Sequence, residues 1–460
     1  MSTPRLMLAA THSGAGKTTL TCGLLQALVS RGLRPAAFKC GPDYIDPMFH
    51  REVMGVSSGN LDLFFTPRGT VRALLTDGAR GCDVAVVEGV MGYYDGLGGT
   101  TDTASAYDLA CATDTPVVLV VDAKGASLSV CALIRGFLAF RENSRIAAVL
   151  LNRCTAMQYQ LLKSLIEREC GVPVLGYVPH DVRFALESRH LGLVTAAEVA
   201  GLREKLAAMA RQLMQTVDID ALLALARTAP PIEDALPPVT RATDCVPVIA
   251  VARDRAFCFY YRENLELLAR LGARLVSFSP MEDEALPEGA CALYLGGGYP
   301  ELHAEALSGN AAMLCALRRA HREGMPIFAE CGGFLYLHDG LTDEQGRRWS
   351  LAGVIPAECR FSGRLRRFGY AELTARRDGL LAPEGARIGA HEFHYFESDA
   401  CGDTFDAVKP VRGTRWACVH ADESLHAGFP HLYFYGNPAF AERFVTAAAQ
   451  YGATGKGANG

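Results

Sequence analysis

The sequence has no long apolar segment, no excess of positive charge and no closely paired cysteines. Its longest apolar runs, at 116–121 and 146–151, fall far short of the roughly 20 residues that a membrane-spanning helix needs. With 45 Lys and Arg against 50 Asp and Glu, the net charge is -5, which gives no general attraction to nucleic acid. The 15 cysteines include no C-x-x-C pair, which argues against a zinc ribbon or a disulfide framework.

The amino-terminal residues also lack the features of a cleaved signal peptide, because they run directly into a glycine-rich motif that needs a folded strand before it. We therefore expect a cytoplasmic protein whose cysteines are mostly reduced core residues. Half of the 460 residues are hydrophobic and 21% are charged, which is typical of a globular chain. At roughly 150 residues per domain, this length predicts two or three separately cored domains.

Short runs of Val, Leu and Ala, closed by Gly, Asp or Asn, alternate with helical stretches along the chain. This alternation predicts an α/β fold in which helices cover both faces of a parallel sheet. We expect a doubly wound domain at 1–200, and a second α/β domain at 247–447 followed by a flexible tail at 448–460. Residues 201–246 are predicted to form a helix and then a linker, because the four prolines at 230–238 exclude a continued helix or a central strand.

The first candidate site follows the apolar run RLMLAA, where THSGAGKTT leads into a helical stretch. A strand, a glycine loop and a helix in this order direct backbone N–H groups at an anion, as in phosphate-binding loops. The pattern G-x-x-x-x-G-K-[ST] is incomplete because Thr11 occupies its first glycine position. We still predict an ATP site in which Lys17 reaches the outer phosphates and Thr18 is available to Mg²⁺. The predicted loop residues are Ser13, Gly14, Ala15, Gly16, Lys17, Thr18 and Thr19.

Charged residues follow the next predicted strands, in the runs FKCGPDYIDP and VVEGVMGYYDG. Because the carboxyl ends of parallel strands form the ligand crevice of α/β proteins, these side chains can converge with the loop. We predict that Lys39, Asp43 and Asp46 contact substrate or phosphate. Thr18, Asp43 and Glu88 are the predicted oxygen ligands of Mg²⁺. An alternative is that Asp43 and Asp46 only shape a Gly/Pro turn, while Glu88 and Asp95 are solvated.

The second candidate site is Cys331, in the run PIFAECGGFLYL. It lies between a predicted strand and an apolar helix, and such a sharp turn projects a nucleophile beside free N–H groups. This arrangement predicts a lowered thiol pKa and an oxyanion hole, for which we propose Gly332 together with Gly297 and Gly298 of the upstream glycine run. The alternative for a lone cysteine is a packing role in the core.

A thiol nucleophile needs a base, and two histidines near the carboxyl terminus are candidates. We choose His431, because it lies in a strand-like aromatic run that can hold an imidazole rigidly, whereas His426 falls in a predicted loop. His391 and His394 lie in another strand-like segment with no third ligand in view. We interpret them as structural or substrate-facing rather than metal-binding.

These runs together resemble one family, the cobyrinic acid a,c-diamide synthases. The resemblance extends from residue 1 to about 447, and rests on SGAGKTT, FKCGPDYIDP, VVEGVMGYYDG, ESRHLGL (187–193), GGGYPE, AECGGFLYL and GAHEFHYFES. The amino-terminal half resembles the P-loop domain of the dethiobiotin-synthetase type. The carboxy-terminal half resembles a class I glutamine amidotransferase domain of the cobalamin-pathway type, which has a flavodoxin-like fold.

The resemblance implies an ATP-dependent amidation of the a and c acetate side chains of a corrinoid polycarboxylate, with ammonia from L-glutamine. Cys331 would be the glutaminase nucleophile and His431 its partner. Related amidotransferases usually have a glutamate two residues beyond the histidine, where this chain has Tyr433. We therefore expect either a Cys–His dyad or an acid from elsewhere in the fold.

The basic stretch RFSGRLRRFG offers a further contact for such a substrate, because guanidinium groups pair well with carboxylates. We hypothesise that Arg364, Arg366 and Arg367 help to hold it. A solvated strand or loop face is an equally good interpretation of this cluster.

Two other functions stay open at this point. One is the same reaction on hydrogenobyrinic acid or nickel-sirohydrochlorin. The other is a P-loop switch protein whose amidotransferase domain has no catalytic role, although Cys331 in an intact elbow argues against it. The expected partners are therefore ATP, L-glutamine and a polycarboxylate, and the sequence leaves the oligomeric state open, a homodimer included.

Overall fold

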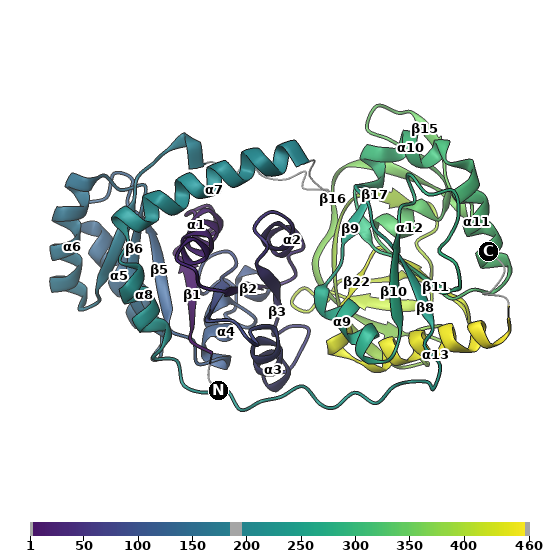
Figure 1. The fold of residues 1–460 in the computed structure, drawn as a ribbon, viewed down its shortest axis with the longest axis horizontal. Coiled ribbons are helices and arrows are strands. Elements are labelled where there is room, and N and C mark those ends of the chain that lie inside the picture. Colours follow the sequence, from purple (N-terminus) through teal and green to yellow (C-terminus); the bar gives the residue numbers. More distant parts are fainter. Residues whose placement is uncertain (1–2, 185–195, 456–460) are drawn as a thin grey trace. The chain divides into compact units, whose positions relative to one another are not determined.

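The computed structural model describes residues 3–184 and 196–455, so the ESRHLGL run at 187–193 lies outside the described residues. The described chain divides between Pro237 and Pro238 into two compact units (Figure 1). Each unit has a mixed α/β structure, which confirms the predicted class. Within the described residues, no helix combines the length and the apolar character that crossing a bilayer requires.

The first unit contains a seven-stranded parallel sheet with the order β3-β2-β4-β1-β5-β6-β7. Most of its strands are apolar along their length, as is typical of strands covered by helices on both faces, and β3 with the sequence SSGNL is the exception. The strands are β1 (Arg5–Ala10), β2 (Pro35–Cys40), β3 (Ser57–Leu61), β4 (Val84–Glu88), β5 (Val117–Asp122), β6 (Ile146–Asn152) and β7 (Val174–Val178). β1 lies in the centre of the sheet, between β4 and β5. The strand order reverses direction at this point, and sheets of this type bind ligands at the loops beside such a reversal.

Eight α-helices accompany this sheet in the described part of the first unit. They are α1 (Lys17–Ser30), α2 (Ile45–Glu52), α3 (Arg68–Gly78), α4 (Ala106–Ala112), α5 (Ser129–Ala139), α6 (Ala156–Cys170), α7 (Ala196–Thr216) and α8 (Ile219–Ala226). Leu213 of α7 and Leu222 of α8 share one buried core with Leu20 and Leu24 of α1. The helical part of the segment that we assigned to 201–246 is therefore packed into the first unit, and an extended chain begins only at about residue 230.

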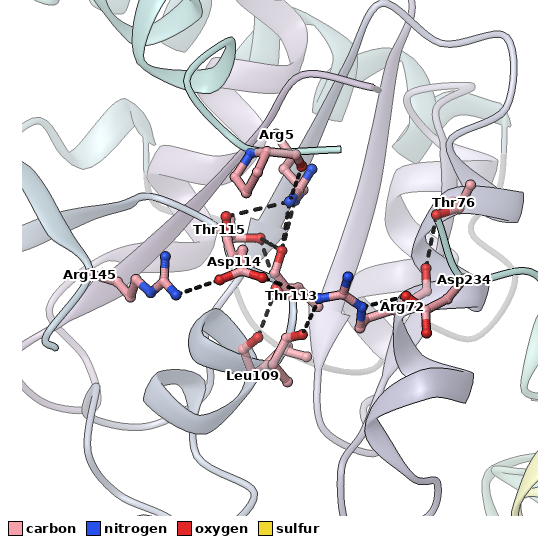
Figure 2. Close-up of polar contacts among 11 residues, drawn as sticks. Arg5, Arg72, Thr76, Leu109, Thr113, Asp114, Thr115, Arg145 and Asp234 are labelled. Carbon is pink, nitrogen blue, oxygen red and sulfur yellow. Dashed lines mark hydrogen bonds and ion pairs between the residues drawn. The ribbon is translucent and has the colours of Figure 1, made fainter. Parts of the chain in front are cut away.

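Two arginines fasten the start of that extended chain to the first unit (Figure 2). The Arg5 guanidinium is 2% exposed and donates hydrogen bonds to the carbonyls of Thr113 and Pro230, each at 2.8 Å. Arg72 Nε donates to Asp234 Oδ2 at 2.6 Å. Burial lowers the pKa of Arg5 to about 10. This value is still well above neutral pH, so the guanidinium remains charged.

We expect Arg5→Met to lower the free energy of unfolding of the first unit by about 2–4 kcal/mol, because buried carbonyls lose their donors. Urea unfolding followed by far-UV circular dichroism measures this change. Arg31→Met is the matched control, since its exposed ion pair with Asp220 should contribute less than about 1 kcal/mol. Equal losses in the two variants would contradict the anchoring role.

The second unit contains a six-stranded sheet with the order β10-β8-β11-β13-β21-β20, parallel except for its last pair. Its strands are β8 (Val248–Ala252), β10 (Arg274–Phe278), β11 (Ala290–Leu295), β13 (Ile327–Glu330), β20 (His420–Ala421) and β21 (Leu425–Gly428). A short antiparallel pair joins β9 (Phe257–Phe259) to β12 (Gly297–Gly298). The accompanying α-helices are α9 (Arg262–Arg270), α10 (Ala304–Gly309), α11 (Ala311–Arg322), α12 (Gly332–Tyr336) and α13 (Ala439–Ala453).

A further, mostly antiparallel sheet of seven strands completes the second unit. It consists of β14 (His338–Thr342), β15 (Arg348–Ser350), β16 (Ile355–Ala375), β17 (Arg387–Ser398), β18 (Phe405–Val408), β19 (Arg415–Cys418) and β22 (His431–Leu432). The pairing of β17 with β22 sets His391 opposite His431. In this way the two sheets of the second unit bring β13, β17 and β22 to one region.

Candidate functional site

The predicted phosphate loop forms the connection from β1 to α1, which begins at Lys17. Gly14 and Gly16 adopt φ values of 79° and 96°, a region that favours glycine. Gly16 also lies against the side chain of Asn152, so that a Cβ at this position would overlap it. Ser13 and Gly14 are exposed, whereas Lys17 is buried and donates hydrogen bonds to the carbonyls of Met91 and His12.

The polar residues predicted on β2 and β4 converge at the same end of the sheet. Lys39 Nζ donates to Glu88 Oε1 at 2.7 Å, forms an ion pair with Asp46, and lies 3.8 Å from Asp43 Oδ2. Thr18 Oγ1 donates to the same oxygen of Glu88 at 2.7 Å. The structure therefore joins the start of α1 to β2 and β4 through one buried polar cluster.

Burial and the mixture of charges shift the pKa values in this cluster. Burial lowers the pKa of Lys17, and the neighbouring Glu88 carboxylate opposes that change. Burial would also lower the pKa of Lys39, but Glu88, Asp46 and Asp43 outweigh it and raise that pKa well above its usual range. Burial raises the pKa of Glu88, against the effect of Lys39.

The cluster has the oxygen ligands that a magnesium–nucleotide complex uses. The carboxylate of Glu88 is fully buried, and its Oε2 has no hydrogen-bond partner in the structure. Mg²⁺ prefers such oxygens, and it usually takes only one or two carboxylates together with phosphate oxygens and water. Asp43 Oδ1 accepts hydrogen bonds from the N–H groups of Ile45 and Asp46, so this residue also shapes the start of α2. No group of three His, Cys, Asp or Glu side chains within residues 3–184 and 196–455 forms a ready metal site.

Two residues that we did not predict support the loop from the end of β6. Asn152 Nδ2 donates to the carbonyl of Ala15 at 2.8 Å, and Arg153 donates to the carbonyl of Gly14 at 3.2 Å. Arg153 also pairs with Asp122 at 2.7 Å. Both residues stand at the carboxyl end of a predicted strand, and this end of the sheet faces the loop. That position was the one feature of the sequence that could have indicated a contact with the loop.

In the second unit, Cys331 occupies the turn between β13 and α12 with φ 47° and ψ -98°, a rarely populated conformation for a residue with a side chain. Its N–H donates to the carbonyl of Gly428 on the neighbouring strand β21 at 2.8 Å. Gly332 and Gly333 follow it, and a Cβ at Gly332 would lie 3.1 Å from the N atom of Gly298. The glycines at 297, 298 and 332 therefore lie around one point beside the cysteine.

The prediction of a lowered pKa for the Cys331 thiol is wrong. Burial raises this pKa, and the nearby carboxylates of Glu301, Glu392 and Glu330 raise it further. The N–H of Gly332 acts in the other direction but is outweighed. The sequence shows the turn but not the acids that the fold gathers around it. The sulfur therefore needs a base to become a thiolate.

His431 is in a position to serve as that base. It is 2% exposed on β22, and a Cβ added at Gly297 would lie 2.5 Å from its Cε1 and 3.2 Å from its Nε2. Gly297 in turn borders Gly332, the residue after Cys331. Burial and the neighbouring His391 and His394 lower the pKa of His431 to about 3, so the imidazole is neutral but a weak base, and proton transfer from the thiol needs a group that stabilises the imidazolium.

The other histidines have different surroundings. His426 lies on β21 rather than in a loop, and contacts Phe328 and Phe405 edge to face. His394 Nδ1 interacts with the carbonyl of Phe396 at 2.7 Å, and its Nε2 lies 3.1 Å from Glu392 Oε2. Their side chains thus contribute to packing in this part of the structure.

We expect Gly297→Ala to reduce glutamine-dependent turnover by about 100-fold, because the new methyl group displaces the imidazole of His431. Ammonia-dependent turnover should be unchanged, since it does not use this imidazole. Gly309→Ala is the matched control, because no atom lies within 4 Å of the added Cβ. Steady-state rates with each nitrogen source decide the prediction. Full glutamine-dependent activity in Gly297→Ala would contradict it.

The arginines at 364–367 are not equivalent in the structure. Arg366 pairs with Glu397 at 2.7 Å, and the guanidinium of Arg367 lies over the ring of Trp416 at 5.4 Å. Only Arg364 among the three is exposed. Arg366 and Arg367 are thus engaged within the protein, and of the three arginines only Arg364 remains a candidate contact for a polycarboxylate.

Comparisons with known proteins agree with this two-part organisation. Residues 6–194 match the model of the CobQ/CobB/MinD/ParA nucleotide binding domain, and residues 248–439 match that of the CobB/CobQ-like glutamine amidotransferase domain. These ranges include the phosphate loop in the first unit and the Cys331 turn in the second.

Curated relatives align over nearly the whole chain. The cobyrinate a,c-diamide synthase of Salmonella typhimurium is 42% identical over 96% of this chain and 97% of its own length. The enzymes of the same name from Caldanaerobacter subterraneus and Listeria innocua are 40% and 39% identical, over 97% and 95% of this chain and 98% and 97% of their own lengths. By this identity and coverage, the chain belongs to the cobyrinate a,c-diamide synthase family.

Proposed function

We propose that this protein catalyses the ATP-dependent amidation of the a and c carboxylates of cobyrinic acid, with ammonia released from L-glutamine, as a step of cobalamin biosynthesis. The observation that carries the proposal is that one chain holds both a phosphate loop joined to a buried acid–lysine cluster and a buried Cys331 turn beside His431. Within the described residues no two cysteines form a disulfide.

The first unit would activate the carboxylate. A carboxylate is a poor electrophile, and transfer of a phosphoryl group from ATP converts it to an acyl phosphate that an amine can attack. In this proposal, Lys17 contacts the outer phosphates, and Thr18 and Glu88 hold Mg²⁺, with Asp43 nearby. Lys39 and Asp46 would contact the transferred phosphate or the substrate. When bound, Mg²⁺ would neutralise charge on the phosphate oxygens.

The second unit would supply the nitrogen. Proposed steps are that His431 takes the proton of Cys331, the thiolate attacks the side-chain amide of glutamine, and the N–H groups at Gly297, Gly298 and Gly332 stabilise the oxyanion. Ammonia leaves as the thioester forms, and water then releases glutamate. Ammonia is mostly protonated at neutral pH, so its release within the same protein keeps it reactive.

The decisive assay supplies purified protein with ATP, Mg²⁺ and glutamine. Cobyrinic acid, hydrogenobyrinic acid and nickel-sirohydrochlorin are tested separately, and the mass gain of each is measured. We expect two amidations of cobyrinic acid, with hydrolysis of glutamine stimulated by ATP and the tetrapyrrole. Preferred amidation of another tetrapyrrole would reassign the substrate. Nucleotide hydrolysis without any glutaminase activity would instead favour a switch protein.

A further inference from the structure

An acidic side chain lies near His431 on a strand that the usual sequence pattern does not indicate. Glu330 is the last residue of β13 and directly precedes Cys331. Its side chain is 2% exposed, and its Oε2 lies 4.0 Å from His431 Nδ1. This separation is too long for a hydrogen bond, and catalytic contacts often tighten only when substrate binds.

Two hydrogen bonds fix the carboxylate in this place. Glu330 Oε1 accepts from the N–H of Leu432 at 2.6 Å, and Oε2 accepts from the Tyr294 hydroxyl at 2.9 Å. Asn264 holds the same strand from the other side, donating to the carbonyl of Leu432 at 2.8 Å and accepting from the N–H of Phe434 at 2.8 Å. The carboxylate and the strand of His431 are thus positioned together.

The two nitrogens of the His431 ring face different groups. Nδ1 faces Glu330, whereas Nε2 lies on the side of Gly297, the residue that borders the Cys331 turn. An acid on Nδ1 and a nucleophile on the side of Nε2 is the arrangement by which a carboxylate sets the tautomer of a catalytic imidazole.

Position 433, two residues beyond the histidine, cannot provide this acid. It is Tyr433, which is fully buried and packs edge to face against Tyr261, with ring centroids 5.0 Å apart. An acidic partner for His431 must therefore come from another position in the fold.

We propose that Glu330 is the positioning residue of the glutaminase site, a proposal that rests on the proposed function. It holds Nδ1 of His431, so that Nε2 takes the thiol proton of Cys331 and the resulting imidazolium faces a carboxylate. The proton moves from sulfur to Nε2, and no other bond changes in this step. Burial raises the pKa of Glu330 to about 8, so this carboxyl group is mostly protonated at neutral pH in the free protein, and an imidazolium on His431 would favour its ionised form.

Other titratable groups face the pair and stay in place when Glu330 is changed. His391 and His394 on β17 face His431, while Glu301 and Glu392 lie near Cys331. Tyr294 on β11 contacts Glu330 itself. If the pH dependence of Cys331 alkylation changes when only Glu330 is replaced, the change can therefore be assigned to the Glu330 carboxylate.

The main variant is Glu330→Gln, which keeps the shape and an acceptor for Leu432 but removes the charge. We expect kcat with glutamine to fall by about 100-fold or more, while KM for glutamine and turnover with ammonium salts change little. We also expect alkylation of Cys331 by iodoacetamide, followed by mass spectrometry of its peptide, to require a pH about one unit higher. Loss of the counterion of the imidazolium should outweigh the smaller, opposite effect of removing the direct repulsion between Glu330 and the thiolate. Tyr294→Phe removes one hydrogen bond to the carboxylate and should give a smaller effect of the same sign.

Glutamine-dependent turnover within about threefold of the wild type in Glu330→Gln would overturn the proposal. So would a loss of turnover without a shift of the alkylation profile, since that result indicates a purely structural role. If Glu330→Gln does not fold, the profile of Tyr294→Phe decides, and an unshifted profile there overturns the proposal. Alkylation needs no corrinoid, so a wild-type protein that fails to amidate cobyrinic acid would count against the proposed function and not against the role of Glu330.

Discussion

Replacement of Cys331 by Ser is expected to abolish glutamine-dependent amidation while turnover with ammonium salts persists. The hydroxyl is a much weaker nucleophile than the thiolate in this site, so we expect a loss of at least about a thousandfold with glutamine. Retained ammonia-dependent activity is expected because the phosphate loop and its acid–lysine cluster belong to the other compact unit. The measurement is the rate of mass gain of cobyrinic acid with each nitrogen source.

Cys258→Ser provides a matched control for this experiment. Cys258 is a buried cysteine of the same unit, on β9, and the proposed reaction does not use it. Its replacement should leave both rates close to those of the wild type. If Cys331→Ser lost both activities equally, the separation of nitrogen release from carboxylate activation would be wrong.

Lys17→Met is expected to remove amidation with either nitrogen source, by about a thousandfold or more, because no cation then lies on the outer phosphates of ATP. Lys17 is 8% exposed, and the variant keeps most of the buried volume of its side chain. Reactivity of Cys331 towards iodoacetamide should be unaffected, since this thiol lies in the second unit. Amidation rates measure the loss of activity, and calorimetry measures whether nucleotide binding is weakened as well.

The control for Lys17→Met is Lys163→Met, on α6. Lys163 lies 3.7 Å from Glu167 on the helix surface, and an exposed pair of this kind contributes little. Amidation at the wild-type rate by Lys17→Met would exclude the loop as the phosphate site. An equal loss in both variants would indicate a general defect in folding.

Much of the first site could be predicted because it depends on local sequence. The apolar run at 5–10, the glycines at 14 and 16 and the residues at strand ends follow from strand length, backbone conformation and the common edge of a parallel sheet. Asn152 and Arg153 were missed, because their contacts with the loop depend on strand order, which the sequence pattern does not provide.

The second site was predicted less completely, and for a physical reason. The elbow at Cys331 is local, whereas the pKa of its thiol depends on Glu301 and Glu392, which lie far from it in the sequence. The role proposed for Glu330 depends on the strand arrangement that brings β22 beside it, whereas the sequence shows Glu330 only as the residue before the cysteine.

The lysine at position 39 has a consequence for how a nucleotide enters the first site. Its ammonium group already compensates charge on the acids of the cluster before any ligand arrives. The protein thus carries an internal counterion, and under the proposed function a metal–nucleotide complex would meet carboxylates that are held in place rather than repelling one another. Preorganisation of this kind reduces the rearrangement that accompanies binding, so the proposed ligand could bind without a prior change in the conformation of these side chains.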